Sequence, residues 1–170
     1  HKKTGRRLVW RHYMLGDLFN PTEEHLMVRE MVKSFVEESV EPQALEFDRK
    51  EEFNLPLFRE LGEMGLLGIT VPEEFGGAGM GATAAAIVHE ELSVSDPGFA
   101  LAYLAHSMLF VNNLAVNGSQ QQKEKFLPAV CSGEAIGCMA MSEADAGTDV
   151  LGLSTTATMN DNGDWVINGS

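Results

Sequence analysis

The segment from Met139 to Val150 carries the residues whose types and spacing are best suited to chemistry. It reads M-A-M-S-E-A-D-A-G-T-D-V, and its first three residues end an expected strand over residues 135–141. Small and hydroxyl-bearing side chains leave backbone N–H groups uncovered, so a flat ligand or a phosphate can approach closely. The pattern predicts a segment that lines a cofactor, although a polar loop that closes a strand explains the same spacing.

Helices precede this segment over most of the chain. Asn20 as the cap, with Pro21 and Glu23 in the first turn, predicts a helix that ends near Pro42. Further helices are expected over residues 54–65, 82–92 and 99–116, and a short polar helix within 120–134. Together they define an all-α domain over residues 20–133.

A β domain is expected to follow. Residues 153–159 and 165–167 have the composition of strands, and Asn160 to Asp164 form the turn of a hairpin between them. We therefore predict an α+β fold class, in which the N-terminal helical domain leads into the beginning of a β-sheet or β-barrel domain over residues 134–170.

Several landmarks along the chain occur in a specific order. The motif V-P-E-E-F-G-G starts at Val71, Y-L-A-H-S starts at Tyr103, and the polar helix within 120–134 leads into S-E-A-D-A-G-T-D from Ser142. In this order they resemble the acyl-CoA dehydrogenase family, and the resemblance runs from about Asn20 to Ser170. Several ordered landmarks are far more specific than a single motif.

The resemblance implies that FAD is the cofactor. In the family, the stretch that matches Met139 to Thr148 lies along the isoalloxazine and the pyrophosphate of FAD. The FAD-binding candidates carried over are Met139, Ala140, Met141, Ser142, Gly147 and Thr148. Thr148 is also expected to contact the acyl-CoA substrate. Ala144 replaces the usual proline and Thr148 the usual serine, so a less rigid loop and a slightly displaced pyrophosphate contact are expected.

The resemblance also implies a reaction, the α,β-dehydrogenation of a short branched acyl-CoA to the 2-enoyl-CoA. In the family a glutamate takes the α proton and flavin N5 receives the β hydride. Hydrogen bonds from the FAD ribityl hydroxyl and a backbone N–H stabilise the developing enolate. That glutamate lies in a C-terminal helical domain, which we expect to be absent here. No catalytic residue is therefore assigned, and the chain is expected to be an inactive fragment.

Partners and location follow from the same resemblance. It implies electron-transfer flavoprotein as the electron acceptor and a homotetramer at full length. The implied location is the mitochondrial matrix, or the cytoplasm in a bacterium.

Two other interpretations of the function remain open. One is an acyl-CoA oxidase or another relative with a different chain-length preference, and the other is a helical interaction module without catalysis.

The charge distribution bears on which partners are possible. Five of the twelve Lys and Arg residues precede the first acidic residue, Asp17, so the remainder carries seven basic against 25 acidic residues, a net charge of −18. Nucleic acid is therefore excluded as a partner, because its binding needs basic residues to neutralise phosphates.

The sequence predicts neither a membrane span nor a metal site. No hydrophobic run is judged long enough to span a membrane. Cys131 and Cys138 lack partners at metal-ligand spacing, so both are expected to be reduced thiols and no metal site is predicted.

The N-terminal segment, residues 1–19, differs from the rest of the chain. It is basic and free of acidic residues as far as Leu15, as the tail of a mitochondrial presequence would be. A cloning remnant or a misassigned start explains it equally well.

Two further motifs could suggest function. The glycines between Gly76 and Gly81 follow a possible strand at Leu66 to Val71, but they run G-x-G-x-G and lack the spacing of a dinucleotide-binding loop. His106 and Ser107 are adjacent on a helix and point in different directions, so a structural or substrate-pocket role is expected for His106.

Overall fold

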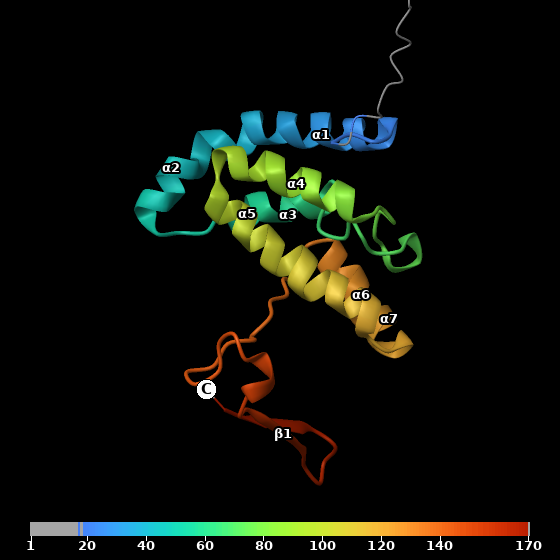
Figure 1. Cartoon of the computed structure of the whole chain (residues 1–170), viewed down its shortest axis with the longest axis vertical. Helices are drawn as coiled ribbons and strands as arrows, with labels where there is room; N and C mark the ends of the chain where they lie inside the picture. The colour runs from blue at the N-terminus through green and yellow to red at the C-terminus, as the bar shows by residue number, and fades with distance from the viewer. Residues whose placement is uncertain (1–16, 18, 170) are drawn as a thin grey trace, which may run out of the picture. The chain divides into compact units, whose positions relative to one another are not determined.

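The computed structural model describes Asp17 and residues 19–169. The described chain divides between Gly137 and Cys138 into a helical unit and a β unit, each of which is treated by itself. The expected α+β class is confirmed, since helices are followed by the first strands of a sheet (Figure 1).

The helical unit contains α-helices interrupted by two π-helical stretches. Its elements are α1 (Glu23–Phe35), the π-helix η1 (Val36–Val40), α2 (Glu41–Lys50), α3 (Leu55–Glu63), the 3-10 turn η2 (Glu73–Phe75), α4 (Ala82–Ser95), α5 (Pro97–Tyr103), the π-helix η3 (Leu104–Asn112), α6 (Asn113–Asn117) and α7 (Gln120–Cys131). The β unit contains the 3-10 turn η4 (Val150–Gly152) and the strands β1 (Thr156–Met159) and β2 (Trp165–Asn168).

The first helix differs from its prediction at both ends. Its N-cap is Thr22, whose hydroxyl accepts a hydrogen bond from the His25 N–H, and the expected cap Asn20 instead accepts one from Arg29. The chain also stays helical past Pro42, as far as Lys50. In η1 the N–H of Glu41 bonds to the Val36 carbonyl, five residues back. This shift of register lets the helix continue through a residue that has no N–H.

Helices α1 and α4 run side by side and form one wall of the core (Figure 1). Their inner faces meet apolar residues of η1, α3 and α5. The largest fully buried side chains of this cluster are Val32, Val40, Phe58, Leu61, Leu66, Leu67, Ile69, Leu92 and Tyr103. The helix expected over residues 54–65 is confirmed as α3, which buries Leu57, Phe58 and Leu61, and Gly65, at φ 75°, follows its last turn.

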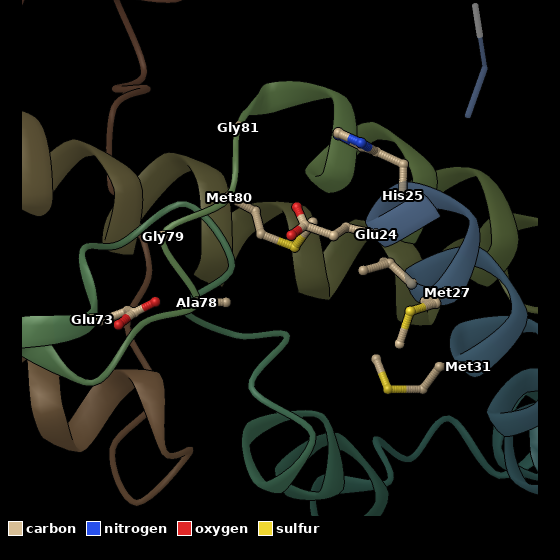
Figure 2. A pocket seen from close by; sticks show the side chains of 10 residues that line it. Glu24, His25, Met27, Met31, Glu73, Ala78, Gly79, Met80 and Gly81 are labelled. Carbon is tan, nitrogen blue, oxygen red and sulfur yellow. The ribbon is translucent and has the colours of Figure 1, made fainter. Parts of the chain in front are cut away.

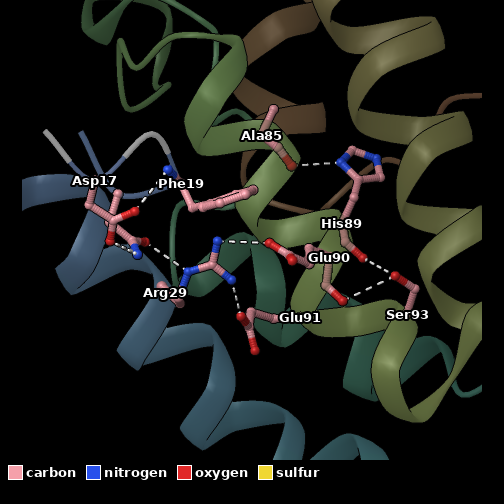
Figure 3. A network of polar contacts seen from close by, with 9 residues as sticks. Asp17, Phe19, Arg29, Ala85, His89, Glu90, Glu91 and Ser93 are labelled. Carbon is pink, nitrogen blue, oxygen red and sulfur yellow. Dashed lines mark hydrogen bonds and ion pairs between the residues drawn. The ribbon is translucent and has the colours of Figure 1, made fainter. Parts of the chain in front are cut away.

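Arg29 links α1 to α4 at the edge of this core (Figure 3). Its guanidinium forms ion pairs with Glu91 and, at 2.7 Å, with Glu90. Asn20 accepts a third hydrogen bond, from Arg29 Nε, at 2.8 Å. The side chains of Arg29 and Glu91 are only 18% and 15% exposed, so removing one partner leaves the other charge poorly solvated.

Substitution of Arg29 by methionine is expected to lower the free energy of unfolding by about 2 kcal/mol, because Glu91 loses its partner in a largely buried position. Lys33→Met on the same helix is the control. Its pair with Glu37 spans 3.9 Å between side chains that are 62% and 61% exposed, so a change within about 0.5 kcal/mol is expected. Urea unfolding measures both variants, and equal midpoints would contradict the prediction.

The glycine-rich segment is a turn held by its own backbone. The N–H groups of Ala78, Gly79 and Met80 donate to carbonyls of Gly68, Val71 and Ile69, respectively, at 2.8–3.1 Å. Residues 66–71 form turns and no strand. These three N–H groups are therefore not available to a phosphate, which agrees with the rejection of a dinucleotide-binding loop.

The expected helix over residues 99–116 is confirmed and extends over Pro97–Asn117 as α5, η3 and α6. Asp96 caps it, since its carboxylate accepts from the Phe99 N–H at 2.9 Å. Contrary to the sequence expectation, this helix of 21 residues contains an 18-residue window with a mean hydropathy of 1.4, so it is long and apolar enough to cross a membrane by length and composition alone. Several of its side chains are buried within the helical unit, among them Tyr103, His106, Ser107 and Val111.

The β unit contains one antiparallel hairpin among its described residues. Thr156 pairs with Asn168 and Met159 with Trp165, and Gly163 takes φ 83° in the intervening turn, as predicted. The strand expected over residues 135–141 is wrong, because no described segment pairs with these residues. An extended segment becomes a strand only where a neighbour satisfies its N–H and C=O groups.

Candidate functional site

The predicted cofactor segment folds around a tight turn at residues 143–146. Glu143 N–H donates to the Ala146 carbonyl at 2.9 Å, and Ala146 N–H donates back to the Glu143 carbonyl at 3.2 Å. Ala146 is buried, while Ser142 and Gly147 lie exposed on either side of the turn. The turn therefore places the predicted residues Ser142 and Gly147 next to its paired ends.

Hydrogen-bond donors are uncovered on both sides of this turn. Within the part of the chain that the structure describes, the N–H groups of residues 139–142, 147 and 148 have no hydrogen-bond partner. The hydroxyls of Ser142 and Thr148 are likewise without one. A Cβ added to Gly147 would meet no atom within 4 Å, so the packing of this unit does not itself require glycine there. Open donors and an open glycine fit a ligand with many acceptor oxygens and a flat ring.

The donors of this segment are neutral. No Lys or Arg occurs among residues 138–169, and Asp145 and Asp149 are exposed nearby. An anionic group bound here would therefore be held by N–H and hydroxyl donors of this unit and not by its side-chain charges.

Glu143 has a role that the sequence did not reveal. Hydrogen bonds from Thr155 and Ser154 lower the pKa of Glu143 to about 2, so the carboxylate remains ionised at neutral pH. The sequence assigned this glutamate no role. The only sequence feature that could have indicated these contacts is the S-T-T run at residues 154–156, whose hydrogen-bond donors could bind an acidic side chain.

His106 is buried in η3 and makes two hydrogen bonds to the backbone. Its Nδ1 accepts from the Gly137 N–H at 3.0 Å, so its Nε2 carries the proton and donates to the Val130 carbonyl at 2.9 Å. Burial lowers the pKa of His106, and the hydrogen bond to the Val130 carbonyl partly opposes that shift. Both ring nitrogens are occupied, which gives the side chain a structural role within the helical unit.

A cavity of about 680 Å³ opens in the helical unit between the first turns of α1 and the glycine-rich turn (Figure 2). Methionines 27, 31 and 80 line it together with Val28, and the carboxylates of Glu24 and Glu73 lie at its edge. None of the predicted cofactor residues lines this cavity. Its glycine-rich wall lacks free donors at residues 78–80, so it has none of the features that mark the segment at 139–148.

Metal and thiol chemistry find no support among the described residues. No group of three His, Cys, Asp or Glu side chains there could hold a metal ion. Both cysteines are free thiols, and burial raises the pKa of Cys131 to about 11, which makes its thiolate scarce at neutral pH.

The family model that matches the chain is "Acyl-CoA dehydrogenase, N-terminal domain", over residues 22–134. The mitochondrial isovaleryl-CoA dehydrogenase of Pongo abelii is 43% identical over 157 residues, which cover 87% of this chain and 37% of that protein. The mitochondrial long-chain specific acyl-CoA dehydrogenase of Sus scrofa is 39% identical, over 88% of this chain and 34% of that protein.

A solved structure adds a match in three dimensions. The crystal structure of an acyl-CoA dehydrogenase complexed with FAD from Bacillus anthracis superposes with a TM-score of 0.81 at 36% sequence identity, over 87% of this chain and 26% of that chain. The chain thus spans little more than a third of the length of the curated relatives it matches. Its helical unit, its hairpin and its ordered motifs agree with one family, and the chain belongs to the acyl-CoA dehydrogenase family.

Proposed function

We propose that this chain is part of an FAD-dependent acyl-CoA dehydrogenase and that residues 139–148 bind the flavin. The observation that carries the proposal is the set of uncovered N–H and hydroxyl donors on both sides of the turn at 143–146. The family relationship and the FAD complex of the Bacillus anthracis relative support the same assignment.

The residues of the segment have distinct tasks in this proposal. Met139, Ala140 and Met141 lie along the isoalloxazine ring, where small or flexible apolar side chains permit close approach. Ser142, Gly147 and Thr148 offer donors to acceptor oxygens of the ring edge and the pyrophosphate. The Thr148 hydroxyl also contacts the acyl-CoA. FAD supplies the acceptor for the hydride that leaves the β carbon of the substrate.

The proposed reaction converts a short branched acyl-CoA, of the isovaleryl-CoA type formed in leucine catabolism, into its 2-enoyl-CoA. The α proton leaves to a base and the β hydrogen leaves as hydride, so two hydrogens are removed. We assign no base within the chain. The 43% identity to an isovaleryl-CoA dehydrogenase favours this substrate class, and the 39% identity to a long-chain enzyme makes a different chain length the second candidate.

The wider setting is part of the same proposal. Electrons pass from the reduced flavin to an electron-transfer flavoprotein, and the full-length enzyme assembles as a homotetramer. The mitochondrial relatives favour the mitochondrial matrix as its location, and relatives of bacterial origin favour the cytoplasm of a bacterium.

A visible absorption spectrum of the full-length protein tests the proposal. We expect bound flavin whose absorption bleaches when isovaleryl-CoA is added without oxygen. Bleaching only with another acyl-CoA would retain the reaction and replace the substrate. Rapid reoxidation by oxygen would indicate an acyl-CoA oxidase, and a colourless protein that cannot be loaded with FAD would overturn the proposal in favour of a helical interaction module.

A further inference from the structure

The carboxylate of Glu143 binds a distant part of the β unit with both of its oxygens. Oε2 accepts hydrogen bonds from the Ser154 N–H at 2.7 Å and from the Ser154 hydroxyl at 2.9 Å. Oε1 accepts from the Thr155 N–H at 2.9 Å. The donors are eleven and twelve residues along the chain, so the carboxylate closes a loop that contains the whole turn and residues 147–153.

The backbone of Glu143 belongs to the turn itself. Its N–H and C=O both pair with Ala146, which forms an isolated antiparallel bridge. One residue therefore joins the turn, through its backbone, to the start of β1, through its side chain. The positions on either side, Ser142 and Gly147, make no backbone hydrogen bonds of their own within the described chain.

These hydrogen bonds also orient the carboxylate of Glu143. A carboxylate close to a bound pyrophosphate would repel it, and no basic side chain among residues 138–169 compensates. Three hydrogen bonds from Ser154 and Thr155 occupy the carboxylate oxygens instead. Charge-assisted bonds of this kind hold a side chain more firmly than neutral ones.

We propose that Glu143 is a positioning residue of the flavin segment, which holds the turn at residues 143–146 against Ser154 and Thr155 so that the donors at Ser142, Gly147 and Thr148 are preorganised for FAD. The inference rests on the proposed function of this segment. It goes beyond that function because the role given to Glu143 acts through Ser154 and Thr155.

Glu143→Gln in the full-length protein is the test variant. Glutamine keeps the size of the side chain, but its NH₂ group faces an N–H donor where the carboxylate had an acceptor. We expect the dissociation constant of FAD, measured by titration of the FAD-free protein, to rise roughly tenfold or more. Asp161→Asn is the matched control. It removes the same charge from an exposed side chain in the hairpin turn, outside residues 139–148, and is expected to change FAD affinity by less than about twofold.

Two readouts separate positioning from a general loss of stability. Amide hydrogen exchange at Ser154 and Thr155 in the FAD-free protein should accelerate in Glu143→Gln and not in Asp161→Asn. At saturating FAD, the fine structure of the visible flavin band should differ from that of the wild type, because the donors around the ring have moved. A variant that is only less stable would bind a flavin of unchanged spectrum.

The outcomes distinguish this inference from the proposed function. If the wild type binds no FAD, the proposed function fails. If the wild type binds FAD and Glu143→Gln binds it equally well, the proposed function stands and the role of Glu143 is overturned. If Glu143→Gln does not fold, Ser154→Ala replaces it as the test variant, because it removes one of the three hydrogen bonds. We expect a rise of about twofold to fivefold in the FAD dissociation constant, and an unchanged value would overturn the inference.

Discussion

Replacement of Gly77 by alanine is expected to destabilise the helical unit by about 3 kcal/mol or more. A Cβ at this position would lie 2.1 Å from the Val71 carbonyl oxygen and 2.6 Å from the Gly68 carbonyl oxygen. Both carbonyls are fixed, because they accept hydrogen bonds from Gly79 and Ala78. Relief of the clash therefore requires breaking the backbone bonds that form the glycine-rich turn.

Gly81→Ala is the control for this prediction. An added Cβ at Gly81 meets no atom within 4 Å, and its φ of −89° suits any residue. The only expected cost is that of a poorer N-cap for α4, at most about 1 kcal/mol. Urea unfolding followed by helical circular dichroism measures both variants. Equal unfolding midpoints would show that the glycine-rich turn is deformable and does not hold α4 in place.

Elements whose signals are local could be predicted from the sequence. The helix α3 and its end shortly before Gly65 depend on residues within one or two turns, as does the hairpin turn ending at Asp164. The passage of the first helix through Pro42 could not be predicted in this way. It depends on the π register of η1, which a residue pattern does not reveal.

The other differences between the predicted and the observed structure depend on residues that are distant in the sequence. Residues 135–141 have a strand-like pattern, but within the described chain they have no neighbouring strand to pair with. The apolar length of Pro97–Asn117 reflects side chains such as Tyr103 and Val111 that pack inside the unit. A pattern of apolar residues alone does not say what covers them.

The candidate site could be found from the sequence in part. Small and hydroxyl residues at 139–148, together with ordered family landmarks, predict where a flavin binds. The anchoring of this segment by Glu143 could not be predicted, because its partners Ser154 and Thr155 lie beyond the reach of any local motif. Side-chain to backbone bonds across a loop become visible only once the loop is folded.

Substitution of His106 by alanine is expected to lower the free energy of unfolding by about 3–5 kcal/mol. The histidine side chain is 1% exposed, and its loss leaves a cavity beside Phe58. It also leaves the Val130 carbonyl and the Gly137 N–H without their partner, and each unpaired buried group adds to the cost. His106→Gln is the matched variant. Its amide can still donate to Val130, so a smaller loss is expected, measured by urea unfolding as before.

The same residue is expected to make stability depend on pH. The native pKa of His106 is lowered below the ordinary value of 6.5 because burial disfavours the charged ring. As pH falls below about 6.5, the unfolded chain therefore binds a proton that the folded chain does not, and the folded state loses stability by at most about 1.4 kcal/mol per pH unit.

The stability lost through His106 can be distinguished by its pH range from the stability lost through the carboxylates. Glu143, whose pKa falls from 4.5 in the unfolded chain to about 2, contributes stability that is lost only at lower pH, below about 4.5. Unfolding free energies of the wild type and His106→Gln between about pH 7.5 and pH 5 therefore isolate the histidine. We expect the difference between them to narrow as the pH falls, since only the wild type must keep a buried imidazole neutral. A constant difference would mean that the folded protein accommodates the charged ring, with the Gly137 N–H no longer bound to Nδ1.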